Sequence, residues 1–288
     1  MDVFLPAGPF LEMKKIQHFV LTRFNLRLEE LSQDLDTDKT GRKIDRDEWL
    51  GHRFDLFERY CLPSMTAQKN RDFQWLLFFD ESTPERFRNR IEADSAVCPQ
   101  IRIFYIKGTH IHGHLMDLVD PDTDVLITTR LDNDDAFHED ALQVIREQVQ
   151  NTRSNLCVNL RFGLELKGNE AEVISHRYNP FSSMIEFPEN GEYRTIFATA
   201  HGKISSIAPV RQIVDQPYWL RVIHDRNITN REGEAFARPS MRDFKSMRRY
   251  LKNRVLIKLR RGLWPNELRR KYGIDEIRQK FHIGDLSS

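Results

Sequence analysis

The chain has 288 residues, of which 40% are hydrophobic and 30% charged, so it is long enough to bury a core and is not a disordered protein. Lys and Arg (44) almost balance Asp and Glu (43), which excludes a protein that binds polyanions over its whole surface. The charges are unevenly placed, however. Residues 238–288 carry 15 basic and 5 acidic residues, a net +10, which leaves 1–237 with 29 basic and 38 acidic residues, a net −9. We therefore expect a body over 1–237 and a basic extension over 238–288.

The cellular compartment is predicted from what the sequence lacks. The first fifteen residues, MDVFLPAGPFLEMKK, do not have the basic-then-apolar order of a signal peptide, and no run approaches the roughly 20 apolar residues that span a bilayer. The 3 cysteines are an odd number and form no CxxC pair. We expect a cytoplasmic protein with reduced thiols.

Strand-like and helix-like runs alternate along the body, the pattern of an α/β fold with a mostly parallel sheet. The runs that predict strands are 16–22, 73–79, 101–106, 124–129 and 155–166, followed by less regular strand material at 196–207 and an apolar segment at 218–223. The runs that predict helices are 48–60, which Pro63 stops or kinks, 82–93 and 138–150. The run 73–79, FQWLLFF, is apolar except for Gln74, as expected for a strand buried on both faces.

The sequence of the basic extension predicts a cationic amphipathic helix. Its apolar residues recur at steps of three and four, at Phe244, Met247, Leu251, Val255 and Leu259, and Lys and Arg occupy the other faces. Such a helix can lie on an anionic membrane surface, and residues 238–271 are the candidates for that contact. The alternative is that it packs against the acidic body.

The segment TTRLDNDDA, residues 128–136, is the strongest candidate for chemistry. Asp132, Asp134 and Asp135 lie within four positions directly after a β-branched strand. Carboxylates this close repel one another, so the arrangement favours a divalent cation at the end of the strand, where open α/β sheets bind ligands. The alternative is an acidic turn in which Asp135 caps the following helix.

Residues 62–85 resemble a known stretch of family 2 glycosyltransferases. That stretch runs from a Ser-rich helix end and a Gln, through an apolar strand, to Asp-Asp-Gly-Ser, and its matching positions here are Gln68, Phe73, 75–79, Asp80, Ser82 and Thr83. Upstream, FVLTRFN resembles that family's strand ending in Pro-Thr-Tyr-Asn. The match departs from the family at Leu21, which replaces the proline, and at Glu81, which replaces the second Asp and is followed directly by Ser82.

More narrowly, TRFN, the helix at 49–58, the Leu-Pro-Ser to Gln run, TRLDNDDA and WLRVIHDRNITN together resemble the rhamnosyl transferase family. The resemblance implies a GT-A-like, Rossmann-like fold in which a nucleotide-diphospho-sugar lies over the carboxyl edge of the sheet and Mn²⁺ or Mg²⁺ joins the acidic motif to the diphosphate. The substrate-binding residues that it implies are Thr22, Arg23, Phe24, Asp80, Arg130 and Asp132. The metal ligands that it implies are Asp132, Asp134 and His224, with His201 as a competitor for His224. Asp225 is our first candidate for the general base, and Glu165 and Glu186 are the alternatives.

The function expected is metal-dependent transfer of a sugar, with rhamnose a candidate, from a nucleotide-diphospho-sugar to a glycan or lipid-linked acceptor, by an enzyme peripheral to the inner face of the membrane. Two alternatives stay open. A metal-dependent nucleotidyl- or phosphotransferase uses a similar acidic cluster, although the chain has neither GxGxxG nor a Walker sequence. The basic extension also suits a nucleic-acid-associated protein, but the body has no recognisable nucleic-acid module, so we do not expect a nucleic-acid partner.

Overall fold

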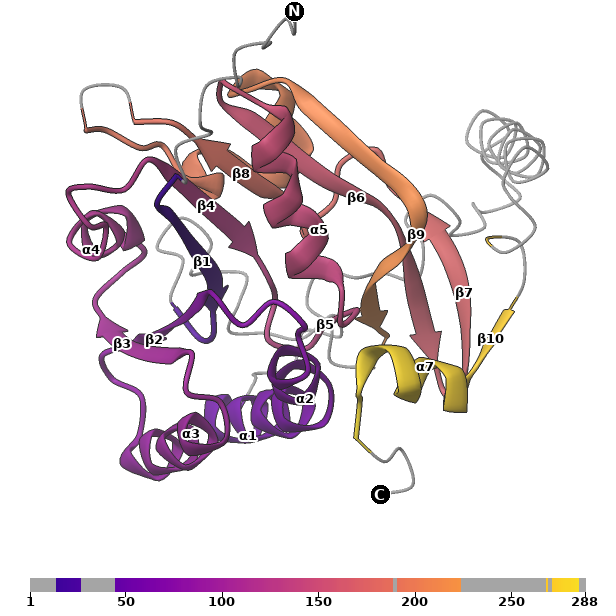
Figure 1. The fold of residues 1–288 in the computed structure, drawn as a ribbon. Coiled ribbons are helices and arrows are strands. Elements are labelled where there is room, and N and C mark those ends of the chain that lie inside the picture. Colours follow the sequence, from indigo (N-terminus) through magenta and orange to yellow (C-terminus); the bar gives the residue numbers. More distant parts are fainter. Residues whose placement is uncertain (1–13, 27–44, 189–190, 224–267, 269–270, 285–288) are drawn as a thin grey trace, which may run out of the picture.

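The computed structural model describes residues 14–26, 45–188, 191–223, 268 and 271–284. A single mixed sheet runs through this part of the chain, in the strand order β10-β7-β6-β8-β4-β1-β2-β3 (Figure 1). Its parallel half consists of β1 (Ile16–Arg23), β2 (Gln74–Asp80), β3 (Ile101–Ile106) and β4 (Val125–Arg130). These four strands are those predicted from the sequence, and their carboxyl ends meet at one edge.

Beyond β4 the sheet continues with mainly antiparallel strands. They are β8 (Ser183–Glu186), β6 (Leu156–Lys167), β7 (Glu170–Ser175) and β10 (Lys271–Gly273). The long strand β9 (Val210–Val222) runs parallel to β6 and also pairs with the two-residue strand β5 (Ala136–Phe137). The pairing with β5 brings the end of β9 next to the segment that follows β4.

The helices cover the two faces of the sheet. Those on one face are α1 (Arg46–Leu56), α2 (Leu62–Thr66), α3 (Glu85–Val97) and α5 (Ala141–Glu147), and α4 (Ile111–Met116) lies on the other. Successive side chains of a strand point to opposite faces of the sheet. Val20, Leu77 and Phe79 therefore pack on the side of the first set of helices. Leu21 and Phe78 pack on the side of α4. The expected α/β fold, with helices on both sides of the sheet, is confirmed.

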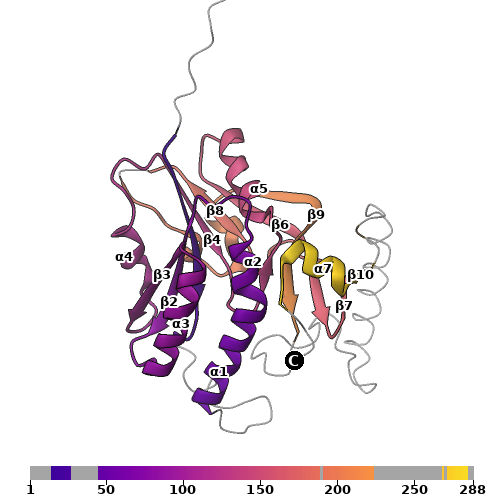
Figure 2. The same ribbon diagram turned by 60° about the horizontal axis from the view of Figure 1, so that its bottom comes forward.

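A π-helical turn, Phe57–Cys61, joins α1 to α2, so that the three form one continuous rod (Figure 2). Pro63 lies in the first turn of α2, where its missing N–H costs no helical hydrogen bond, and the rod therefore continues past the proline. The side chain of Asp45 caps the start of α1 by accepting from the N–H groups of Asp47 and Glu48. The aromatic rings that α1 and the turn bury, Phe54 and Phe57, pack around Phe24.

Two sequence expectations about secondary structure are wrong. Residues 196–207 form two 3₁₀ turns, Ile196–Ala198 and His201–Ser206, because only Ile196 and Ile204 bury their side chains and no period-two pattern supports a strand. The helix predicted to begin at residue 82 begins instead after Pro84, without a side-chain cap. The Ser82 N–H and hydroxyl both bond to the Asp80 carboxylate.

The C-terminal end of the chain returns to the body. β10 adds to the edge strand β7, and α7 (Ile274–Phe281) buries Ile277 and Phe281 in a second core cluster with residues of β6, β7 and β9. The N–H of Gly284 donates to the carbonyl oxygen of Arg59 in the π-helical turn, at 2.7 Å. The amphipathic helix expected over 244–259 and the boundary expected at 237/238 lie outside the described residues. None of the helices that the structure describes is long and apolar enough to cross a membrane.

Candidate functional site

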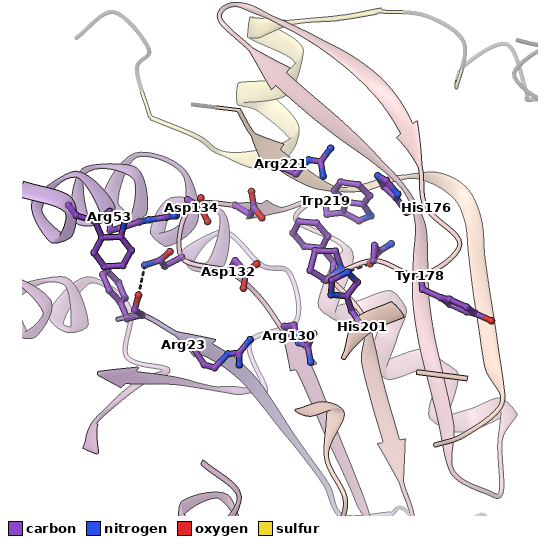
Figure 3. A pocket seen from close by; sticks show the side chains of 17 residues that line it. Arg23, Arg53, Arg130, Asp132, Asp134, His176, Tyr178, His201, Trp219 and Arg221 are labelled. Atoms are coloured by element: carbon purple, nitrogen blue, oxygen red, sulfur yellow. Dashed lines mark hydrogen bonds and ion pairs between the residues drawn. The ribbon is translucent and has the colours of Figure 1, made fainter. Parts of the chain in front are cut away.

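A cavity of about 410 Å³ opens at the carboxyl edge of β1 and β4 (Figure 3). One wall comes from the ends of these strands and from α1, and it consists of Arg23, Phe24, Trp49, Arg53, Arg130 and the four residues 132–135. The opposite wall comes from later segments, and it consists of His176, the four residues 178–181, His201, Trp219 and Arg221. The cavity therefore lies where ligands bind in open α/β sheets.

The three aspartates of the acidic segment all line this cavity. Burial raises the pKa of Asp132, and the charge of Asp134 raises it further. Burial, together with the charges of Asp134 and Asp132, holds the pKa of Asp135 well above its ordinary value. The Asp132 carboxylate makes no hydrogen bond or ion pair with another described residue, whereas Asp134 forms an ion pair with Arg53. The cluster thus carries negative charge that its surroundings only partly compensate.

Asp135 does not cap a helix. The next helix, α5, has Asp140 at its N-cap position, and Asp135 instead accepts a hydrogen bond from the N–H of Val222 at 3.2 Å. This bond ties the end of β9 to the acidic segment. A second bond, from the Asn133 side chain to the carbonyl oxygen of Phe24 at 3.3 Å, ties the same segment to the end of β1.

Arg23 and Arg130 form a cationic pair beside the aspartates. Both guanidinium groups lie over the ring of Phe197, at 4.8 and 4.7 Å from its centroid. Arg130 is buried, donates to the carbonyl oxygens of Ile196 and Thr199 at 3.2 Å each, and leaves its Nε without a partner. Burial and the charge of Arg23 lower the pKa of Arg130 to about 10. Neither arginine forms an ion pair with a carboxylate in the described part of the chain.

Two of the residues implied by the resemblance lie behind the cavity wall. The hydroxyl of Thr22 is buried, donates to the carbonyl oxygen of Leu131 at 2.8 Å and accepts from the indole of Trp75 at 3.0 Å. Asp80 is buried at the end of β2, and its carboxylate binds Ser82. The structure gives both side chains internal partners, and neither lines the cavity.

The other residues implied by the resemblance either line the cavity or lie outside the described residues. Arg23, Phe24, Arg130, Asp132 and Asp134 share the cavity, although Phe24 is mostly buried against other aromatic rings. His224 and Asp225 lie outside the described residues. Across the ranges that the structure describes, no group of three His, Cys, Asp or Glu side chains is arranged to hold a metal ion. Asp132 and Asp134 still fit a hard cation such as Mg²⁺ or Mn²⁺, because carboxylate oxygens are its preferred ligands and donor phosphates can complete the coordination.

Sequence reasoning missed the opposite wall almost entirely. Trp219 stacks on Phe181 at 4.4 Å, and its indole donates to the carbonyl oxygen of Leu160 at 2.7 Å. Two histidines face the same space. Burial and the charge of Arg221 lower the pKa of His176, and burial and the charge of Arg130 lower that of His201. No local motif joins these residues, which come from three separate segments, so only the fold brings them together.

The fold and the cavity define an α/β protein with acidic and basic side chains gathered in a cavity at the carboxyl edge of its parallel strands. A sequence model of the family described as "Putative rhamnosyl transferase" matches residues 17–235 of this chain. The chain belongs to that family.

Solved structures resemble this chain at low sequence identity. Residues 1–349 of TarS from S. aureus share 10% identity, with a TM-score of 0.40 over 72% of this chain and 60% of TarS 1–349. The same TarS fragment in complex with UDP has a TM-score of 0.41 at the same identity and coverage. The 4-diphosphocytidyl-2C-methyl-D-erythritol synthase of Anaerococcus prevotii DSM 20548 has 10% identity and a TM-score of 0.35 over 69% of this chain and 87% of its own. No curated protein matches this chain.

Proposed function

We propose that this protein is a glycosyltransferase that moves a sugar, with rhamnose as the first candidate, from a nucleotide-diphospho-sugar to an acceptor hydroxyl. The observation that carries the proposal is the juxtaposition of Arg23 and Arg130 with Asp132 in one cavity. Two guanidinium groups that form no ion pair with a described carboxylate suit an anion. Beside them, a carboxylate that accepts no hydrogen bond from a described side chain or backbone group suits a cation. A metal-bound diphosphate presents both kinds of charge together.

Arg130 is the strongest support for the anion. A buried guanidinium is costly to keep charged unless an anion compensates it, and a second arginine nearby increases that cost. The bonds from one terminal nitrogen of Arg130 to two carbonyl oxygens hold the guanidinium in place, and its Nε is a buried donor that no described residue satisfies. Arginine also matches phosphate geometry through paired N–H donors. Arg23 and Arg130 would therefore hold the diphosphate and stabilise its charge as it leaves.

We propose Asp132 and Asp134 as ligands of Mn²⁺ or Mg²⁺, with His224 as a third. The bond between Asp135 and the N–H of Val222 supports this set, because it brings the chain to the acidic cluster two residues before His224. The metal would supply Lewis-acid stabilisation of the leaving diphosphate. Asp225 would take the proton from the acceptor hydroxyl. The acceptor oxygen would form a bond to C1 of the sugar as the bond from C1 to the phosphate oxygen breaks.

The proposed acceptor is a glycan or a lipid-linked glycan. The charge of residues 238–288, net +10, supports docking of residues 238–271 on an anionic membrane surface. Flotation with phosphatidylglycerol vesicles tests this, with phosphatidylcholine vesicles as the control. Charge reversal at Arg248, Arg249 and Lys252 is expected to abolish flotation, and unchanged flotation would contradict the membrane role.

The test of the donor site measures binding of UDP, GDP and dTDP, each with and without Mn²⁺, to the full chain by calorimetry. We expect one nucleotide to bind and Arg130→Gln to weaken it about 10- to 100-fold, since a hydrogen bond to a charged group is worth about 1.5–3 kcal/mol. The matched control is Arg211→Gln, because Arg211 also donates to a backbone carbonyl, that of Asn151, but lies away from the cavity. Equal affinity of Arg130→Gln and wild type would contradict the proposed site.

Product analysis separates sugar transfer from nucleotidyl transfer. With the matching nucleotide-sugar, a glycosyltransferase releases a nucleoside diphosphate, and Asp132→Asn is expected to lower that release at least 100-fold. Release of pyrophosphate from a nucleoside triphosphate and a sugar phosphate would favour the nucleotidyltransferase instead.

A further inference from the structure

Arg53 reaches from α1 into the acidic cluster. Its guanidinium forms an ion pair with the Asp134 carboxylate, and the two side chains are only 11% and 10% exposed. The guanidinium also lies 5.3 Å from the ring centroid of Trp49, one turn earlier in the helix. Figure 3 shows Arg53 pointing at Asp134 from the side of the cavity opposite Arg221. The helix thus delivers a fixed positive charge to one of the two proposed metal-binding carboxylates.

We propose that Arg53 is an internal counter-ion that competes with the divalent metal for Asp134 and so couples metal binding to donor binding. The inference rests on the proposed donor and metal site. In an ion pair the guanidinium compensates the negative charge of the carboxylate, and its positive charge opposes the approach of a second cation. Metal binding at Asp134 therefore has to overcome the attraction of Arg53, and the free enzyme should bind Mn²⁺ weakly.

The donor removes this opposition. A guanidinium binds carboxylate and phosphate with the same paired donors, so the diphosphate offers Arg53 a second partner within the same cavity. When Arg53 bonds to phosphate, its ion pair with Asp134 weakens and opposes the metal less. Donor and metal then strengthen each other's binding, and by linkage the effect is equal in both directions. Arg53 accordingly makes a loaded metal site depend on the presence of donor.

The test is a titration of the full chain with Mn²⁺, followed by the electron paramagnetic resonance signal of free Mn²⁺, with and without the nucleoside diphosphate that binds. We expect Arg53→Gln to bind Mn²⁺ about tenfold more tightly than wild type without nucleotide, because the competing charge is gone. The nucleotide should tighten Mn²⁺ binding in wild type and do so much less in Arg53→Gln. Arg53→Lys keeps the charge and should stay close to wild type.

Two controls separate this effect from general electrostatics and from misfolding. Arg86→Gln removes the same unit charge from an exposed ion pair with Asp47 and should leave Mn²⁺ affinity unchanged. Arg53→Met keeps the stem over Trp49, and it should reproduce the tighter binding if Arg53→Gln does not fold. Asp134→Asn should remove the gain when combined with Arg53→Gln.

The outcomes distinguish the inference from the proposed function. If wild type binds Mn²⁺ and the folded Arg53→Gln and Arg53→Met variants bind it equally or more weakly, the inference is overturned while the metal site stands. If wild type binds no Mn²⁺ with or without nucleotide, the proposed metal site fails and the inference fails with it. Tighter Mn²⁺ binding together with loss of the nucleotide effect supports it.

Discussion

Gly163 lies in β6 directly against the indole of Trp219, and the two residues are packed too closely for any side chain at position 163. A Cβ added to Gly163 would lie 2.1 to 2.3 Å from three carbon atoms of the indole. Ordinary contacts between carbon atoms are about 3.5–4.0 Å, so Gly163→Ala forces the ring or the strand to move by more than 1 Å. Trp219 is fully buried and lines the cavity, so the movement affects both stability and ligand binding.

The expected loss of stability combines the cost of overpacking with the interactions that Trp219 would lose. Overpacking a core by a methyl group costs about 1–3 kcal/mol. Displacing the ring also weakens its stacking on Phe181 and its hydrogen bond to the carbonyl oxygen of Leu160, which together add about 1–2 kcal/mol. We therefore expect Gly163→Ala to lower the free energy of unfolding by about 3 kcal/mol and Tm by about 6–12 °C.

Differential scanning calorimetry measures the shift, with Gly51→Ala as the matched control. Gly51 lies within α1, and a Cβ there meets no atom within 4 Å. Alanine is the better helix former, so this control should gain about 0.5–1 kcal/mol. A Tm for Gly163→Ala within 1 °C of wild type would refute the close-packing argument, as would additive effects of Gly163→Ala and Trp219→Leu in a double-mutant cycle.

Two further predictions concern the C-terminal segment and His18. Phe281→Ala in α7 should lower the free energy of unfolding, measured by chemical denaturation, by about 3–5 kcal/mol, because Phe281 is only 1% exposed. The control Gln279→Ala changes an exposed residue of the same helix and should leave the stability unchanged. Equal stability of the two variants would mean that the segment is not part of the folded body. Burial lowers the pKa of His18 from 6.5 to about 3, so the unfolded chain binds a proton that the folded chain does not bind over that range. Stability should consequently fall as pH falls from 6.5 toward 3, by about 1.4 kcal/mol per pH unit from this residue. The His18→Gln variant should show a slope shallower by that amount between pH 4 and 6, and parallel slopes would contradict the assignment.

The parallel half of the sheet could be predicted because three of its strands, β1, β2 and β4, are largely buried on both faces. Such strands are nearly continuous apolar runs, as in 73–79, and they stand out without any knowledge of the fold. In residues 196–207 only half of the residues are apolar, and Ile196 and Ile204 are isolated anchors of 3₁₀ turns. Scattered apolar residues of this kind do not identify the local structure, because it depends on which side chains find a core.

The sequence by itself determined the acidic half of the candidate site. Asp132, Asp134 and Asp135 are neighbours in the chain, and the β-branched strand before them indicates where they emerge. They are close in space because they are close in the sequence, so no tertiary structure is needed to bring them together. The same is true of Arg130, which ends that strand.

Only the tertiary structure decided what surrounds these carboxylates. Arg53 is about 80 residues away in sequence from Asp134 and reaches it because the rod of α1 packs its aromatic face on the sheet. Trp219 and Arg221 arrive through the pairing of β9 with β5 and β6. Whether Asp135 caps a helix or holds β9 depends on the position of Val222, 87 residues later. Charge compensation and burial depend on distance in space, and a sequence specifies that distance only through the complete fold.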